Sequence, residues 1–96
     1  MAIRFEWDQR KAAANLKKHG LSFEEASTVF ADPLARIFVD EAHSAEEARE
    51  ILVGHSLLDR LVLVSFTERE PDLIRIISAR VATRSERRAY EENQDP

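Results

Sequence analysis

Five arginine side chains crowd a short stretch near the C-terminus. They lie within fourteen residues, and Glu86 is the only acid among them. The set consists of Arg75, Arg80, Arg84, Arg87 and Arg88. Planar guanidinium groups can bind a phosphate or a carboxylate through two parallel hydrogen bonds. The cluster therefore predicts a surface that binds an RNA backbone, a DNA backbone or an acidic partner protein.

The spacing of the arginines assigns them to two elements. Arg84, Arg87 and Arg88 have the i, i+3, i+4 spacing that places side chains on one face of a helix. Arg75 and Arg80 belong to one strand, and five residues of separation places them on opposite sheet faces unless a bulge intervenes. The alternative interpretation is a solvated face whose arginines pair with Glu91 and Glu92.

His19 and Tyr90 are the candidates for proton transfer. Histidine changes charge near neutral pH, so His19, next to Lys18, could act as a general acid or base beside a phosphate. The alternative is that His19 only caps the end of a helix. Tyr90 could stack on a base or donate a proton, or it could pack its ring against the edge of the domain.

Other site chemistries lack support in the sequence. The chain has no cysteine, which excludes disulfides, thiolate catalysis and cysteine-bound metals. His43 and His55 have no metal-ligand spacing with each other or with a carboxylate. With two glycines in the chain, no glycine-rich phosphate loop can form. We therefore expect neither a metal nor another cofactor.

Length and composition predict one folded domain over residues 1–96. Apolar residues make up 44% of the chain and charged residues 33%, as in soluble folded proteins. No apolar run is long enough to span a membrane, and the N-terminus lacks the apolar region of a signal peptide. These features predict a cytoplasmic protein. The net charge is −4, so the basic stretch stands out against an acidic remainder.

The positioning elements follow from hydrophobic periodicity and capping signals. Strands are predicted at 3–7, 34–39, from 51 onward, 61–67 and 73–80, and helices at 9–19, from 23 onward and from 84 to about 92. This order predicts an α+β fold in which an antiparallel meander carries two N-terminal helices and a C-terminal helix packed on it. We expect the helices to cover one sheet face and to leave the other partly open.

Residues with short polar side chains mark the predicted helix starts. They are Asp8, Ser22, Thr83 and, for a single turn, Ser44. Glu25 and Glu86 lie three residues after Ser22 and Thr83, which predicts two capping boxes. Gly20 is predicted to end the first helix in the left-handed conformation.

Several segments together resemble the BrnT family of bacterial toxins. They are Phe5-Glu6-Trp7-Asp8, Asn15-Leu16-Lys17-Lys18-His19-Gly20, Ser22-Phe23-Glu24-Glu25-Ala26, Val29-Phe30-Ala31-Asp32-Pro33, Arg75-Ile76-Ile77-Ser78-Ala79-Arg80, Ala82-Thr83-Arg84 and Glu86-Arg87-Arg88-Ala89-Tyr90-Glu91. They extend over nearly the whole chain in family order. The middle segment, 40–59, matches more loosely, with Glu47, Arg49 and Gly54 approximating a family pattern.

The resemblance implies a RelE-like fold and a ribonuclease toxin of a type II toxin–antitoxin pair. It also implies a BrnA-like ribbon-helix-helix antitoxin, with operator DNA bound only through the complex. We therefore expect a metal-independent endoribonuclease in which the RNA 2′-hydroxyl attacks the adjacent phosphate. His19, Arg80 and Tyr90 are the expected catalytic residues. RNA binding is expected from Lys18, Arg75, Arg84, Arg87 and Arg88. The alternative is a non-catalytic regulatory subunit that binds nucleic acid or an acidic antitoxin segment.

Overall fold

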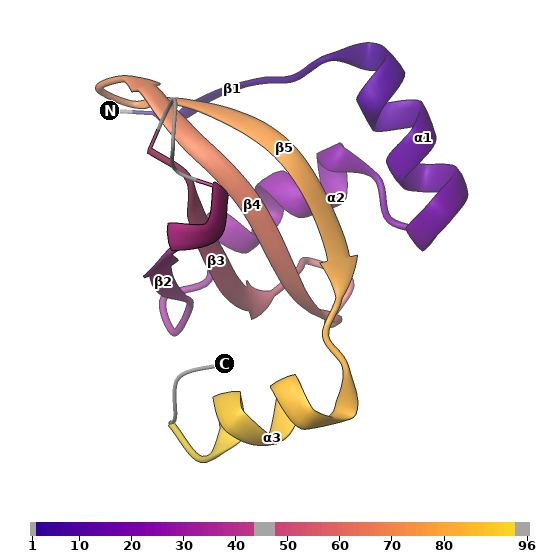
Figure 1. Ribbon diagram of the computed structural model, residues 1–96, viewed down its shortest axis with the longest axis vertical. Helices are drawn as coiled ribbons and strands as arrows, with labels where there is room; N and C mark the ends of the chain where they lie inside the picture. The colour runs from indigo at the N-terminus through magenta and orange to yellow at the C-terminus, as the bar shows by residue number, and fades with distance from the viewer. Residues whose placement is uncertain (1, 44–47, 94–96) are drawn as a thin grey trace.

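The computed structural model describes residues 2–43 and 48–93, which form a five-stranded sheet with three α-helices (Figure 1). The strands are β1 (Arg4–Glu6), β2 (Arg36–Val39), β3 (Glu50–His55), β4 (Leu61–Glu70) and β5 (Leu73–Val81). The helices are α1 (Gln9–His19), α2 (Phe23–Thr28) and α3 (Arg84–Glu91), with 3-10 turns η1 (Val29–Ala31) and η2 (Glu41–His43). The predicted order of strands and α-helices is confirmed.

The sheet has the order β1-β5-β4-β3-β2 and is mixed. Strands β2 to β5 form the predicted antiparallel meander. The expectation of a wholly antiparallel sheet is wrong for β1, which pairs in parallel with β5 in the register Arg4 opposite Leu73. This pairing brings together the first and the last strand of the chain at one edge of the sheet. A three-residue strand carries no local signal of the direction in which it pairs. The turn between β4 and β5 is shorter than predicted because β4 continues to Glu70.

Local hydrogen bonds fix both ends of α1 as predicted. The Asp8 carboxylate accepts the backbone N–H groups of Arg10 and Lys11 at 2.8 and 3.1 Å. At the other end, Gly20 adopts a φ of 65° and donates its N–H to the Leu16 carbonyl at 2.8 Å. Glycine reaches this left-handed conformation without a steric penalty. The helix therefore stops directly after His19.

The start of α2 differs from the predicted capping box. The Ser22 hydroxyl accepts the Glu25 N–H at 3.0 Å, which is half of the motif. The Glu25 carboxylate is buried and turns away from the cap to accept hydrogen bonds from Ser56 and Arg60 in the β3–β4 turn. A long-range ion pair thus replaces the second local bond. The turn predicted at Ser44 lies outside the described residues.

Helices α1 and α2 cover one face of the sheet, where the main core lies (Figure 1). Its fully buried members include Leu21, Phe23, Val29 and Ile76. A smaller cluster of Val53, Leu61 and Leu63 packs on the opposite face. Tyr90 of α3 contacts this second cluster, and α3 stands beyond the end of the sheet. The expectation that all three helices share one face is therefore wrong for α3.

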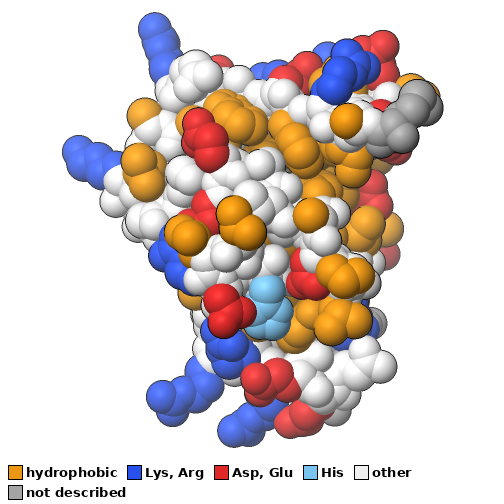
Figure 2. Space-filling model, turned by 180° about the vertical axis from the view of Figure 1, so that it is seen from behind, with side chains coloured by type: hydrophobic (Ala, Val, Ile, Leu, Met, Phe, Trp, Pro, Cys, Tyr) orange, Lys and Arg blue, Asp and Glu red, His pale blue; other side chains and the backbone are white. Residues whose placement is uncertain are grey.

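The helices cover only part of their own sheet face. Ile37 and Val39 on the edge strand β2 are 57% and 66% exposed. Figure 2 views this face and shows apolar side chains gathered on the side of β2. No helix of the described residues is long and apolar enough to cross a membrane. The face opposite α1 and α2, called the open face below, carries the candidate site.

Candidate functional site

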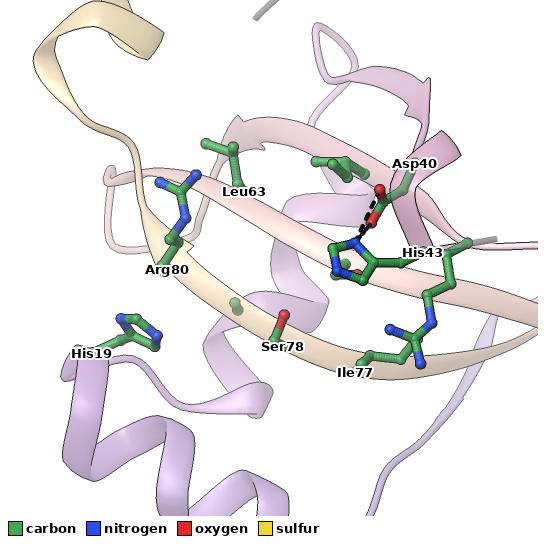
Figure 3. Close-up of a pocket in the computed structure, with 11 residues that line it drawn as sticks. His19, Asp40, His43, Leu63, Ile77, Ser78 and Arg80 are labelled. Atoms are coloured by element: carbon green, nitrogen blue, oxygen red, sulfur yellow. Dashed lines mark hydrogen bonds and ion pairs between the residues drawn. The ribbon is translucent and has the colours of Figure 1, made fainter. Parts of the chain in front are cut away.

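A concave site of ≈ 270 Å³, called the hollow, lies on the open face of the sheet (Figure 3). Strands β3, β4 and β5 form its floor, while η2 and the end of α1 flank it. The lining residues are His19, Asp40, His43, Arg49, Ile51, Leu63, Ser65, Ile77, Ser78, Ala79 and Arg80. The hollow thus collects two histidines, two arginines and two serine hydroxyls around a small apolar floor.

A β-bulge in β5 determines which side chains reach the open face. Ser65 of β4 pairs with Ser78, but the next residue, Phe66, pairs with Ile76, so Ile77 is an extra residue on β5. An extra residue reverses the alternation of the side chains that follow it. Ile76 and Ala79 both enter the main core, three residues apart. Arg75 and Arg80 consequently point to the same face, the outcome that the sequence left conditional on a bulge.

Arg80 enters the hollow as one half of a bidentate ion pair. Its two terminal nitrogens donate to the two carboxylate oxygens of Glu86, both at 2.7 Å. Glu86 also accepts the Thr83 N–H at 2.9 Å, and the Thr83 hydroxyl accepts the Glu86 N–H at 3.1 Å. The predicted capping box of α3 is therefore confirmed, and the same carboxylate orients Arg80.

The electrostatics of this pair follow from the hydrogen bonds. The Arg80 guanidinium, together with the Thr83 N–H, lowers the pKa of Glu86 to about 2 against the opposing effect of burial. The hydrogen bond from Arg80 to Glu86 likewise raises the pKa of Arg80. Both groups are charged at neutral pH. The Arg80 side chain is still 41% exposed, so an anion in the hollow can reach its guanidinium.

Asn15 holds the end of α1 against β5, which positions His19. Its buried side-chain amide donates to the carbonyls of Leu21 and Ala79 at 2.9 and 2.8 Å, and its oxygen accepts the Ala79 N–H at 3.1 Å. Ala79 directly precedes Arg80 in β5. The amide therefore sets the spacing between the two predicted site residues that line the hollow, His19 and Arg80.

The sequence did not identify Asp40 and His43 as site residues. The Nδ1 atom of His43 lies 3.3 and 3.2 Å from the two Asp40 carboxylate oxygens. The backbone N–H of His43 also bonds to the Asp40 carbonyl at 3.2 Å, closing the 3-10 turn. Figure 3 shows the His43 ring across the hollow from His19, with Ser78 between them. The Asp-x-x-His spacing of Asp40 and His43 is a signal that could have indicated this pair. From the sequence alone, His43 is considered only as a possible metal ligand.

The remaining predicted site residues do not line the hollow. Arg75 donates to Glu6 of the neighbouring β1 at 2.9 Å. Lys18, Arg84, Arg87 and Arg88 are exposed on the helices. The pairs that the sequence allowed with Glu91 and Glu92 are not formed among the described residues. These four cations are therefore open to solvent and to a ligand.

Tyr90 serves as a packing residue in the structure. Its hydroxyl donates to the Leu34 carbonyl at 3.1 Å, and its ring meets the His55 ring edge-on at 5.8 Å. Burial, and then the negative charge of Asp32, raises the pKa of Tyr90. Of the three predicted catalytic residues, the structure brings His19 and Arg80 together and leaves Tyr90 outside the hollow.

The comparisons with known proteins agree on one family and one fold. The family model of the ribonuclease toxin BrnT, of type II toxin–antitoxin systems, matches residues 7–86. The 1.1 Å crystal structure of the Brucella abortus ribonuclease toxin BrnT superposes with a TM-score of 0.68. The alignment has 24% sequence identity and covers 86% of this chain and 100% of that chain. A comparison with curated proteins finds no match. At this identity the structural likeness establishes the fold alone.

Proposed function

The chain belongs to the BrnT family of ribonuclease toxins of type II toxin–antitoxin systems, and on this premise we propose that it is a metal-independent endoribonuclease that cuts RNA in the hollow. The observation that carries the proposal is the convergence of His19 and Arg80 on the open face. Cleavage of RNA needs a group that moves protons and a fixed positive charge beside the phosphate. These two residues supply both.

Arg80 is assigned to the phosphate that reacts. Its guanidinium is oriented by Glu86 before RNA arrives, which lowers the entropic cost of binding an anion in a defined geometry. In the transition state the added negative charge on the phosphorane strengthens its attraction to the guanidinium. The proposal assigns the chemistry to protein groups alone. Among the described residues, no group of three or more His, Cys, Asp or Glu side chains could hold a metal ion.

The cations outside the hollow are assigned to the flanking RNA backbone. Lys18 lies in the last turn of α1, directly before His19, and Arg84, Arg87 and Arg88 lie on α3, the element that follows β5. Exposed cations without carboxylate partners contribute sequence-independent affinity for phosphates. Arg75 is assigned an outer contact because it already pairs with Glu6. Tyr90 is assigned to anchoring α3, since its hydroxyl is engaged and its pKa is raised.

Cleavage of single-stranded RNA in the presence of EDTA tests this function. We expect the purified protein to generate fragments that end in a 2′,3′-cyclic phosphate. Arg80→Ala should lower the rate by roughly 100-fold or more, as expected for loss of a group that stabilises transition-state charge. Arg69→Ala is the matched control, because Arg69 is an exposed arginine on β4 outside the hollow. RNA that stays intact at micromolar wild-type protein would reject the proposal.

A second candidate function is supported by the ion pairs of β5. Both arginines of this strand already have carboxylate partners, Glu6 for Arg75 and Glu86 for Arg80. A non-catalytic subunit that binds an acidic antitoxin segment or nucleic acid would use the exposed arginines of α3 instead. Expression in cells separates the two functions. Arrested growth that Arg80→Ala relieves supports the nuclease, whereas unaffected growth with the wild type supports the binding subunit.

The proposal extends to the class of the antitoxin partner and to its contact with DNA. A type II toxin has a protein antitoxin, and we propose a BrnA-like ribbon-helix-helix protein that alone contacts operator DNA. The RelE-like arrangement of sheet and helices and a cytoplasmic location belong to the same proposal. Co-expression with the antitoxin should yield a complex that shifts operator DNA, while the isolated chain should leave that DNA unshifted.

A further inference from the structure

We propose that His43, oriented by Asp40, is the general base of the reaction and that His19 is the general acid facing it across the hollow. This inference rests on the proposed ribonuclease function and adds the identity of both proton-transfer groups. It also defines the substrate as a flexible RNA segment whose 2′-hydroxyl and 5′-oxygen can reach opposite sides of the hollow. A histidine from η2 and the carboxylate of Asp40, which directly precedes η2, thereby join a histidine from α1.

The contact between Asp40 and His43 fixes which nitrogen can accept a proton. A carboxylate only accepts hydrogen bonds, so the hydrogen of the neutral ring resides on Nδ1, 3.2 Å from the Asp40 oxygen. The Nε2 atom is then left with its lone pair. A histidine held in one tautomer by a carboxylate is the arrangement that prepares an imidazole for general-base catalysis. Arg49 and Arg80 are the other charged residues that line the hollow.

His19 occupies an environment that suits the opposite role. It is the last residue of α1 and is only partly buried, so its ring can reach a bound substrate. Lys17 and Lys18 precede it in the last turn, and Arg80 shares the hollow with it. No carboxylate is within ion-pair distance of His19 among the described residues. Its imidazolium is therefore available to donate a proton to the leaving group.

The roles give a balanced transesterification. Nε2 of His43 removes the proton of the 2′-hydroxyl as the 2′-oxygen forms a bond to phosphorus. The bond between phosphorus and the 5′-oxygen breaks, and His19 delivers its proton to that oxygen. The products are a 2′,3′-cyclic phosphate and a 5′-hydroxyl, and no further reactant is required. Asp40 is a positioning residue, since it acts on the substrate only through His43.

Single substitutions with matched controls test the assignment. His43→Ala and His19→Ala should each lower kcat/KM by at least about 100-fold, the usual contribution of a general acid or base. His55→Ala is the control, because His55 is a histidine on β3 outside the hollow. The His43 side chain is 65% exposed, so its truncation should leave the unfolding transition unchanged. Asp40→Asn should lower kcat by roughly tenfold and leave KM nearly unchanged, because Asp40 acts on the substrate only through His43.

A substrate that needs no acid separates the two histidines. In an oligonucleotide that spans a mapped cleavage site, sulfur replaces the bridging 5′-oxygen, and the thiolate leaves without being protonated. We expect this substrate to restore His19→Ala to within about tenfold of the wild type and to leave His43→Ala impaired. The pH profile should lose its acidic limb in His43→Ala and its alkaline limb in His19→Ala.

Two results would overturn the inference. If His43→Ala cuts RNA within threefold of the wild type while Arg80→Ala is inactive, the base lies elsewhere and the ribonuclease function stands. If the sulfur substrate rescues His43→Ala and not His19→Ala, the two roles are reversed and the assignment is rejected. A wild type that leaves RNA intact in EDTA removes the ribonuclease function itself, together with this inference.

Discussion

Glu86 performs two tasks with one carboxylate. It closes the capping box that starts α3, and it holds the Arg80 guanidinium through two hydrogen bonds of 2.7 Å. A capping glutamate normally contributes to one helix only. Here the same group connects the start of α3 to the end of β5, where the hollow lies. The stability of the cap and the orientation of the site arginine are therefore linked.

Glu86→Gln should destabilise the fold in a pH-dependent manner. The pKa of Glu86 is about 2 in the folded protein against 4.5 for a free glutamate, so the charged pair stabilises the fold above pH 4.5. This contribution declines as the pH falls from 4.5 toward 2. At pH 7 we expect the free energy of unfolding to fall by about 2 kcal/mol. This is less than the full pKa difference would give, because Arg80 is partly exposed and solvent screens its charge. Urea unfolding at pH 7 and pH 3.5 measures the difference.

Glu91→Gln is the control for this measurement. Glu91 is exposed on the same helix and has no partner among the described residues. Its substitution should change the free energy of unfolding by less than about 0.5 kcal/mol at either pH. A Glu86→Gln effect that is equal at pH 7 and pH 3.5 would mean that the charge of Glu86 does not contribute to stability.

Helix α1 and strand β5 are joined by one buried amide. The Asn15 side chain forms hydrogen bonds with both the N–H and the carbonyl of Ala79. Ala79 lies further along β5 than the three residues that pair with β1. Without this side chain, that part of β5 would be an unpaired strand edge buried beneath a helix. Buried backbone groups that lose their partners are costly, so the amide substitutes for a missing neighbouring strand.

Asn15→Ala should therefore affect both stability and activity. Three hydrogen bonds to backbone groups disappear, and we expect the free energy of unfolding to fall by about 2–4 kcal/mol. RNA cleavage at a temperature where the variant stays folded should also fall, because His19 is no longer held beside Arg80. Leu16→Ala is the control on the same helix, since Leu16 is 52% exposed and should cost less than about 1 kcal/mol. Thermal unfolding and cleavage rates together measure the effect, and equal losses in the two variants would contradict it.

The elements that could be predicted from the sequence are those fixed by near neighbours. Asp8, Gly20 and Thr83 form hydrogen bonds with residues at most four positions away. The helix caps at these residues can therefore be predicted from the sequence, and the structure confirms them. The bulge at Ile77 was not predictable, because an extra strand residue is defined only by its pairing with β4. The parallel pairing of β1 with β5 and the ion pair of Glu25 with Arg60 could not be predicted either, because both depend on contacts between distant parts of the chain.

The candidate site was predicted in part for the same physical reason. Arg80 and His19 were found from residue type and position, and the structure places both in the hollow. Asp40 and His43 lie in a polar segment without hydrophobic periodicity, so their position in the hollow could not be predicted from the sequence. Residue type alone indicates Tyr90 as a candidate, whereas its position is determined by packing against Val53, Leu61 and Leu63.

The net negative charge of the molecule opposes the binding of RNA, but the positive charges are distributed so that RNA can bind at one place. The chain carries a net charge of −4, yet exposed Arg84, Arg87 and Arg88 stand on α3. Figure 2 shows Lys and Arg side chains projecting at the end of the molecule that α3 forms in Figure 1. An acidic body weakens adhesion to nucleic acid at other places. Binding should thus be local and should depend on salt through a small number of phosphate contacts.

Removal of two α3 arginines should reduce that salt dependence. Each phosphate contact on single-stranded RNA contributes roughly 0.7 to the slope of log K against log salt. The double variant Arg84→Gln/Arg88→Gln should therefore lower the slope by about 1.4 and weaken binding at low salt. The control, Arg10→Gln/Lys11→Gln, removes the same charge from the start of α1, roughly 14 Å along the helix from His19. Fluorescence anisotropy with a labelled oligonucleotide across a salt series measures both slopes. If the control lowers the slope as much as the α3 variant, affinity arises from net charge and α3 does not guide the RNA.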